Sequence, residues 1–213
     1  KLFARGGSYR SNVRPGIYPK WSRVHLRIWC SERLGQSVLW PLRTMIRSAP
    51  VMAWVLRQLG ATVGKNLQCA HDVEFSGPLD LLSIEDDVAI QTGAYVSMSS
   101  WVGQELHVGP VRLASGCTIG MRAGVADHVT VGRGSWITPL TPVLGGVGPE
   151  EIWEGAPARF VGRCTELRRA SSGCRHVLPF WLLETLNIGM QLALEFSLQV
   201  LPAAVVAWWA ASF

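Results

Sequence analysis

A strict six-residue repeat of aliphatic side chains runs through residues 113–143. Its members are Leu113, Ile119, Val125, Val131, Ile137 and Val143. A small or slim residue stands four positions after each of the first five, namely Cys117, Ala123, Val129, Ser135 and Thr141. Neither the 3.6-residue period of an amphipathic helix nor the two-residue period of a half-buried strand produces this spacing. The hexapeptide period predicts a parallel β-helix, in which short strands stack coil on coil around an aliphatic core.

The repeat extends upstream with two interruptions. Ile84, Ile90, Val96, Val102 and Val108 keep the six-residue spacing, and Val63, Cys69, Phe75 and Leu81 form an earlier set. The phase slips by three positions before Ile84 and by one before Leu113. Because insertions in repeat folds bulge from one face and often carry function, the regions near 76–78 and 103–105 are the first candidates for a site. Glycines are expected at corners that need a positive φ, and these are Gly116, Gly120, Gly124, Gly132 and Gly134.

Charge is distributed unevenly along the chain. The first sixty residues contain eleven Lys or Arg and a single acid, Glu32, whereas the remainder contains nine Lys or Arg and fourteen acids. A basic segment in a chain with ten tryptophans favours contact with membrane lipids that have anionic headgroups. No nucleic-acid-binding motif is present, so nucleic acid is not an expected partner.

The five cysteines show no C-x-x-C spacing and are odd in number. They are Cys30, Cys69, Cys117, Cys164 and Cys174. Cys69 and Cys117 fall in core slots of the repeat. This pattern indicates reduced, structural thiols.

The end of the chain, residues 177–213, is almost entirely apolar. It is long enough for one transmembrane helix, or for one helix and the start of another broken near Pro202. Glu184 and Glu195 would share one face of that helix, so a buried helical hairpin remains the alternative. Arginines between residues 159 and 175 place the β-helix on the cytoplasmic side by the positive-inside tendency.

Four regions follow from these patterns: a basic, Trp-rich lead-in with amphipathic helices (1–60), the β-helix (61–163), a basic linker (164–176) and the transmembrane segment (177–213). In the lead-in, the helices either lie in the membrane interface or pack on the solenoid as its cap. The chain lacks an initiator Met and stops just past Trp209. We expect it to be a piece of a larger multi-pass protein.

The repeat and its closing sequence WEGAPARFVGR (153–163) resemble the hexapeptide-repeat acyltransferases, a superfamily with a left-handed β-helix. In that superfamily the closing Gly-x-Pro-Ala, here residues 155–158, leads into a C-terminal helix. LRQLGATVG (56–64), LLSIEDDVAIQTGA (81–94) and the lead-in GIYPKWSR (16–23) are similar to the β-helix domains of membrane-bound non-ribosomal peptide synthetases of the ε-poly-L-lysine type. The resemblance covers nearly the whole chain.

This resemblance implies a membrane-associated acyl or aminoacyl transferase. Its substrate would be a group bound as a thioester to coenzyme A or to the phosphopantetheine of a carrier domain. Other copies or domains of the same synthetase would be its partners. In the related domains a histidine occupies the position of Ser99. A serine hydroxyl can orient a substrate but is a poor base near pH 7, so a catalytically silent copy is the alternative.

Transfer to an amine needs a base and donors for the developing oxyanion. His107, His71 and His128 are the candidate bases, and Ser99 is the fourth candidate site residue. His107 is favoured because it lies beside the second interruption. The three histidines occupy different slots of the repeat, so a zinc site is not expected.

Three functions therefore stay open. The first is a carrier- or coenzyme-A-dependent transferase domain of a synthetase. The second is a silent scaffold or spacer that positions active copies. The third is a stand-alone, membrane-anchored acetyltransferase that forms a trimer through its β-helix.

Overall fold

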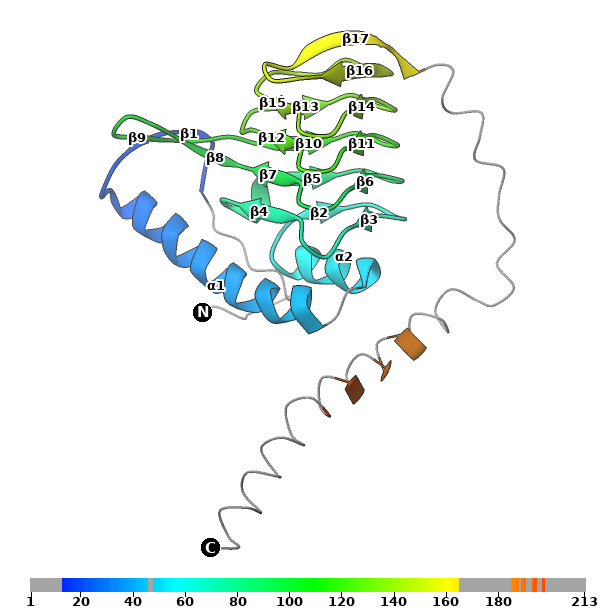
Figure 1. The fold of residues 1–213 in the computed structure, drawn as a ribbon. Helices are drawn as coiled ribbons and strands as arrows, with labels where there is room; N and C mark the ends of the chain where they lie inside the picture. Colours follow the sequence, from blue (N-terminus) through cyan, green and yellow to red (C-terminus); the bar gives the residue numbers. More distant parts are fainter. Residues whose placement is uncertain are drawn as a thin grey trace, which may run out of the picture.

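A computed structural model describes residues 13–45, 48–164, 185–187, 189, 190, 193, 194 and 197. Three parallel sheets form the sides of a β-helix, as the hexapeptide period predicts (Figure 1). Sheet 1 contains β2 (Thr62–Val63), β5 (Leu82–Ile84), β10 (Val111–Leu113) and β13 (Thr130–Val131). Sheet 2 contains β3 (Gln68–Cys69), β6 (Ala89–Ile90), β11 (Thr118–Ile119), β14 (Trp136–Ile137), β16 (Glu151–Glu154) and β17 (Arg159–Arg163). Sheet 3 contains β4 (Glu74–Ser76), β7 (Tyr95–Ser97), β12 (Gly124–Val125) and β15 (Pro142–Val143).

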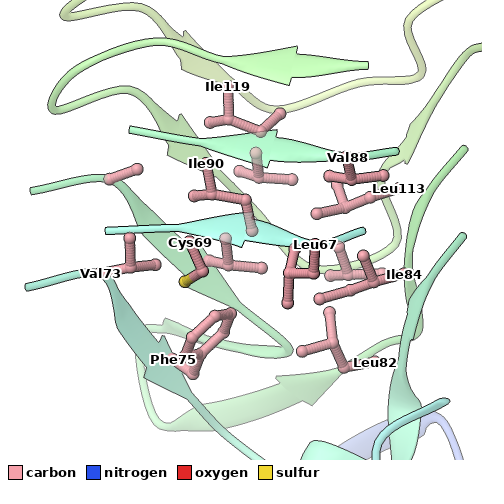
Figure 2. Close-up of a cluster of buried hydrophobic side chains, with 14 of the residues drawn as sticks. Leu67, Cys69, Val73, Phe75, Leu82, Ile84, Val88, Ile90, Leu113 and Ile119 are labelled. Atoms are coloured by element: carbon pink, nitrogen blue, oxygen red, sulfur yellow. The ribbon is translucent and has the colours of Figure 1, made fainter. Parts of the chain in front are cut away.

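Equivalent aliphatic residues of successive coils stack on one another in the core (Figure 2). In sheet 2, Cys69 pairs with Ile90, Ile90 with Ile119, and Ile119 with Ile137. The small slots also point inward, because all five of their residues are buried. The register inferred from the sequence, with one aliphatic and one small inward position in each six-residue repeat, is therefore confirmed for residues 113–143.

Three residues assigned to the upstream repeat do not occupy inward slots of the coils. Leu81 is half-buried in a short 3₁₀ turn, and Val102 and Val108 lie in an insertion. Val102 is 58% exposed, and Val108 is buried in a separate small cluster with Val13, Ile28 and Leu106. The slip of one position is in fact a longer insertion that leaves the solenoid after β7 and returns at β10. Val108 matched the six-residue spacing of apolar residues because it is apolar and buried, but its burial is in the small cluster and not in the core of the β-helix.

The expectation for the glycines was right for two of the five. Gly116 and Gly134 have φ of 69° and 65°, whereas Gly120, Gly124 and Gly132 do not have a positive φ. Gly120 has a different role, because a Cβ there would lie 2.6 Å from the carbonyl oxygen of Ile137 in the next coil. Close approach of two coils, and not backbone conformation, selects glycine at this position.

Both ends of the solenoid are covered. Helix α2 (Ala49–Gln58) has Pro50 in its first turn and buries Met52, Val55 and Leu56 against the first coil. At the other end β16 joins sheet 2 and β17 pairs with it in the antiparallel sense. The closing residues 155–158 therefore lead into a strand and not directly into a helix.

The insertion forms a hairpin of β8 (Ser99–Val102) and β9 (Glu105–Val108), and β1 (Gly16–Pro19) pairs with β9 as a third antiparallel strand. Helix α1 (Arg23–Met45) begins beside this sheet and runs along one flank of the solenoid towards α2 (Figure 1). The earlier interruption is a short 3₁₀ turn, η1 (Leu79–Leu81). Of the two lead-in helices, α2 covers the end of the solenoid, and α1 buries Ile28 and Leu39 along its inner face.

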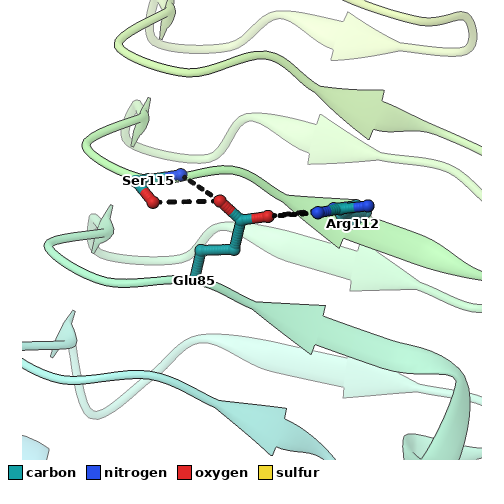
Figure 3. A network of polar contacts seen from close by, with 3 residues as sticks. All are labelled: Glu85, Arg112 and Ser115. Atoms are coloured by element: carbon teal, nitrogen blue, oxygen red, sulfur yellow. Dashed lines mark hydrogen bonds and ion pairs between the residues drawn. The ribbon is translucent and has the colours of Figure 1, made fainter.

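A polar network ties two coils together at the edge of sheet 1 (Figure 3). The Glu85 carboxylate accepts hydrogen bonds from Arg112 Nε and Nη2, at 3.0 and 2.6 Å, and from the Ser115 amide and hydroxyl, at 3.1 and 2.9 Å. The hydrogen bonds from Arg112, and after them those from Ser115, lower the pKa of Glu85 from its ordinary value.

Most of the predicted transmembrane segment 177–213 and of the linker 164–176 lies outside the described residues. Within the described part of the chain, no helix is both long and apolar enough to cross a bilayer. The described residues between 185 and 197 are helical, and Leu186, Met190 and Leu194 among them are exposed.

Aspartate at neighbouring positions of β13 tests the register. Val131 is fully buried and pairs with Leu113, whereas Thr130 is exposed. A carboxylate among stacked aliphatic side chains costs several kcal/mol, so Val131→Asp should lower the melting temperature strongly or prevent folding. Thr130→Asp should change the free energy of unfolding by at most about 0.5 kcal/mol. Thermal unfolding followed by circular dichroism measures both, and equal losses would contradict the register.

Stability should depend on the charge of Glu85. Its folded-state pKa lies below the ordinary value of 4.5, so its contribution is complete above that value and is lost as the pH falls through the folded-state pKa. Urea unfolding should show wild type more stable than Glu85→Gln at pH 7, and the difference should vanish in acid. The difference should be small because Arg112 is largely exposed. A difference that persists unchanged at low pH would show that charge is not the cause.

Candidate functional site in a pocket between the first helix and the solenoid

Local sequence signals fix the start of α1. The Ser22 hydroxyl accepts a hydrogen bond from the His25 amide at 3.1 Å, which is the usual role of a serine that precedes the first turn of a helix. Leu106 and Val108 of the hairpin pack with Ile28 in a small core. These contacts hold the first half of α1 against the hairpin.

A pocket of about 470 Å³ lies between α1, the hairpin and sheet 3. Its apolar lining includes Ile28, Leu106 and Val125. Its polar and aromatic lining consists of His25, Trp29, Glu32, Ser76, Tyr95, Ser97, Ser99, Ser100, Trp101 and Asp127. The pocket thus combines an apolar floor with a small set of convergent polar groups, which is typical of small-molecule sites.

The hydrogen bonding of His25 fixes the position of its proton. Its Nδ1 accepts a hydrogen bond from the Trp21 amide at 3.1 Å. In the neutral ring the proton must then be on Nε2, which is a donor. The Trp101 ring meets the imidazole edge-on, with centroids 5.1 Å apart and an interplanar angle of 87°. His25 is thus held as a hydrogen-bond donor in the wall of the pocket.

The sequence interpretation missed His25, Glu32 and Asp127. His25, Ile28, Trp29 and Glu32 have the spacing of one helix face, and that was the available signal. Only the tertiary structure shows that this face meets the hairpin and sheet 3.

His107 does not line the pocket. It pairs with Ser100 and Ile17 across the three-stranded sheet, and its Nε2 lies 3.9 Å from an oxygen of Glu105. Leu106 and Val108, the neighbours of His107 on β9, face α1, so His107 faces the other way. The favoured histidine is therefore on the opposite face of the hairpin from the pocket.

His71 and His128 are also absent from the pocket lining, although His128 follows Asp127, which is part of it. His71 is exposed in the turn between β3 and β4. His128 is exposed in the turn after β12, with φ of 60°, and its ring lies over Gly109 of the preceding coil. The structure does not bring the three predicted bases together, and each remains a prediction.

Ser99 lines the pocket, unlike the three predicted histidines. Its amide and carbonyl both bond to the Ser97 hydroxyl, which accepts from the first and donates to the second. This local turn fixes the start of β8. Ser99 therefore lies where it can contact a bound substrate.

The Cys117 thiol belongs to the core of the β-helix. Burial raises the pKa of the Cys117 thiol to about 12, so this residue is a packing group. In the described residues no group of three His, Cys, Asp or Glu side chains is placed to hold a metal ion.

The β-helix has close counterparts among solved structures. A galactoside acetyltransferase in complex with coenzyme A superimposes with a TM-score of 0.56 at 14% identity, covering 78% of this chain and 94% of that one. A maltose O-acetyltransferase from Clostridium difficile 630 gives 0.51 at 14% identity, covering 71% and 94%. A hexapeptide-repeat acetyltransferase from Vibrio cholerae O1 biovar eltor, in complex with acetyl coenzyme A, gives 0.50 at 17% identity, covering 64% and 88%. The fold is that of the hexapeptide-repeat acyltransferases.

Curated sequences point to the same superfamily. Delta-poly-L-ornithine synthetase of Acinetobacter baumannii (strain AB307-0294) is 27% identical over 160 residues, which is 72% of this chain and 11% of the synthetase. UDP-3-O-acylglucosamine N-acyltransferase of Caulobacter sp. (strain K31) is 29% identical over 127 residues, 56% of this chain and 36% of that protein. No family model matches the chain. The matched region is only a minor part of each curated relative's length. The resemblance to hexapeptide-repeat acyltransferases and to a synthetase of this kind is confirmed.

Proposed function

We propose that this chain is a transferase domain that moves an acyl or aminoacyl group from a thioester to an amine, in the pocket between α1, the hairpin and sheet 3. The observation that carries the proposal is His25, held with Nε2–H as a donor in a pocket of an acyltransferase-type β-helix. One curated relative is named an N-acyltransferase and the other a poly-L-ornithine synthetase.

The pocket residues can divide the chemistry between them. The amine nitrogen attacks the thioester carbonyl carbon, the new C–N bond forms, and the C–S bond breaks. His25 Nε2–H donates to the carbonyl oxygen as negative charge develops there. The Asp127 carboxylate accepts the proton that leaves the amine and returns it to the departing thiolate, which ends as a thiol.

The lining suits the uncharged end of a thioester. Trp29, Trp101 and Leu106 give apolar walls for an acyl chain and a pantetheine arm, while among the described residues no Lys or Arg lines the pocket to receive phosphates. The pocket therefore holds the reactive end of the donor, and its phosphates lie outside. Solved neighbours bind coenzyme A or acetyl coenzyme A. In this proposal the donor is such a thioester, or the same pantetheine arm on a carrier domain.

The proposal places the domain at a membrane, on the cytoplasmic side, beside other domains of a synthetase. Trp21 is 83% exposed and Leu26 is 61% exposed, and Arg23 and Arg27 lie beside them on α1. Apolar and basic side chains exposed together suit an anionic bilayer surface. In this proposal the apolar segment 177–213 spans the bilayer, in keeping with the exposed Leu186, Met190 and Leu194.

Release of thiol from acetyl coenzyme A, or from an aminoacyl phosphopantetheine thioester, tests the transfer. His25→Ala should lower the rate by about 10²–10³-fold, since removing one oxyanion donor costs that much. His107→Ala should retain most of the rate, because His107 lies on the far face of the hairpin. The reverse result would show that the active site is on that face of the hairpin, with His107 as the base inferred from the sequence. Wild type without any turnover would support the scaffold alternative.

Vesicle co-sedimentation tests the membrane face. Wild type should bind vesicles containing phosphatidylglycerol more than pure phosphatidylcholine vesicles, and added salt should weaken this binding. The Trp21→Ser, Leu26→Ser double variant should bind less. Phe160→Ser, which removes an exposed apolar side chain from β17 at the other end of the solenoid, is the matched control. Equal losses in both proteins would contradict a specific role for α1.

A further inference from the structure

The pocket and the segment that forms its outer wall carry charges of opposite sign. Among the described residues the lining contains two carboxylates, Glu32 and Asp127, and no Lys or Arg. Residues 1–60 nevertheless contain eleven Lys or Arg. Negative charge in a partly desolvated cavity repels phosphate groups, so a donor with a phosphate at one end can place only its uncharged end inside. The charges of the pocket therefore determine which end of such a donor enters.

Arg33 lies at the border between the pocket and the solvent. Its guanidinium carbon is 5.8 Å from the centroid of the Trp29 ring. Trp29 lines the pocket and is 48% exposed, so its ring reaches from the cavity to the solvent and marks the mouth of the pocket. With 3.6 residues per turn, Arg33 is about 40° around α1 from Trp29, whereas Arg27 is about 160° from it. Arg33 is therefore at the mouth, and Arg27 faces away from it.

The Arg33 guanidinium has hydrogen-bond donors left for a ligand. Within residues 13–45 and 48–164 no carboxylate forms an ion pair with it. Its sequence neighbour Glu32 instead accepts a hydrogen bond from the Ser76 hydroxyl at 3.3 Å. The cation–π contact with Trp29 holds the guanidinium in place without using its N–H groups. Because these donors form a planar fork that matches two phosphate oxygens, the mouth of the pocket suits a phosphate group.

The spacing along α1 suits a pantetheine arm. Arg33 follows His25 by eight residues, which is about 12 Å along the helix axis. In the proposed transfer, His25 Nε2–H meets the thioester carbonyl at the other end of this distance. A pantetheine arm joins a sulfur atom to a phosphate ester through a flexible, uncharged chain that can cover it. Trp29 lies one turn after His25 and offers that chain apolar surface inside the pocket.

We propose that Arg33 binds the phosphate ester of the pantetheine arm at the mouth of the pocket, and that Glu32 and Asp127 keep this phosphate out of the interior. This rests on the proposed transfer, because it orients the donor for that reaction. The same phosphate ester occurs in coenzyme A and on a carrier domain, so either source presents it to Arg33. Arg33 is a donor-binding residue: it holds the arm about 12 Å from the thioester and takes no part in bond making.

Binding of pantetheine and 4′-phosphopantetheine to the full chain tests the site by calorimetry. The phosphorylated ligand should bind roughly fivefold tighter or more, as expected for one additional exposed charge contact. Arg33→Gln removes the charge at an exposed position, so the fold should persist and the preference should disappear. Arg159→Gln, the same change at an exposed position on β17, should keep it. Equal affinity of wild type for the two ligands, an unchanged preference in Arg33→Gln, or equal losses in both variants would overturn the proposal.

Turnover separates this site from the transfer itself. Arg33→Gln should raise KM for S-acetyl-4′-phosphopantetheine with little change in kcat, because it removes binding that is shared by ground state and transition state. KM for S-acetylpantetheine, which lacks the phosphate, should not change. Preferential binding of the phosphorylated arm without thiol release would keep the site and reject the transfer. Thiol release with a KM that Arg33→Gln leaves unchanged would keep the transfer and reject Arg33 as the phosphate site.

Acetyl coenzyme A distinguishes the two sources of the arm. A lower KM for acetyl coenzyme A than for S-acetyl-4′-phosphopantetheine, retained in Arg33→Gln, would identify coenzyme A as the donor, because its nucleotide would then make contacts of its own. Equal KM values for the two donors would show that only the arm and its phosphate ester are recognised, as expected for a donor bound to a carrier domain.

Discussion

In-register stacking of aliphatic side chains between hydrogen-bonded coils is the interaction on which the rest of the structure depends. Coils joined by parallel strands lie about 4.8 Å apart, so each inward residue packs directly on its counterpart. Ile90, Ile119 and Ile137 form one such column. Because every coil must return to the same three columns, the chain has to turn sharply at fixed places. Positive φ at Asn66, Asp87 and Gly116, one residue per coil between sheets 1 and 2, meets that requirement.

The same constraint explains where the site arises. Coils between residues 111 and 143 have no room for extra residues inside the stack, so an insertion must leave at a corner. The β8–β9 hairpin leaves after β7, is extended by β1, and carries its own apolar face of Leu106 and Val108. Helix α1 packs on that face. The pocket is the space that remains between these added elements and the outer surface of sheet 3.

The sequence predicted the repeat well because each of its slots packs on the equivalent slot of the next coil, so the same residue types recur at a fixed spacing. It failed where burial has another origin, as with Val108, which is buried by α1 and not by a neighbouring coil. The candidate site was harder to predict, because His25, Glu32 and Asp127 are up to about one hundred residues apart and meet only through the docking of α1. Histidines close to the interruptions, such as His107, were visible in the sequence, but the face of the hairpin on which they lie was not.

The pocket is enclosed by parts of the protein that differ in how firmly they are held. Its floor, sheet 3, belongs to the main aliphatic core, to which Leu39 in the second half of α1 is also joined. The hairpin and the first half of α1 depend instead on a core of four buried residues, Val13, Ile28, Leu106 and Val108. Regions with few buried apolar contacts open at a lower free energy than the rest of a fold. The wall that carries His25 and Trp101 is therefore expected to open at a lower free energy than the coils, which would give the proposed thioester donor a way in that does not require unfolding.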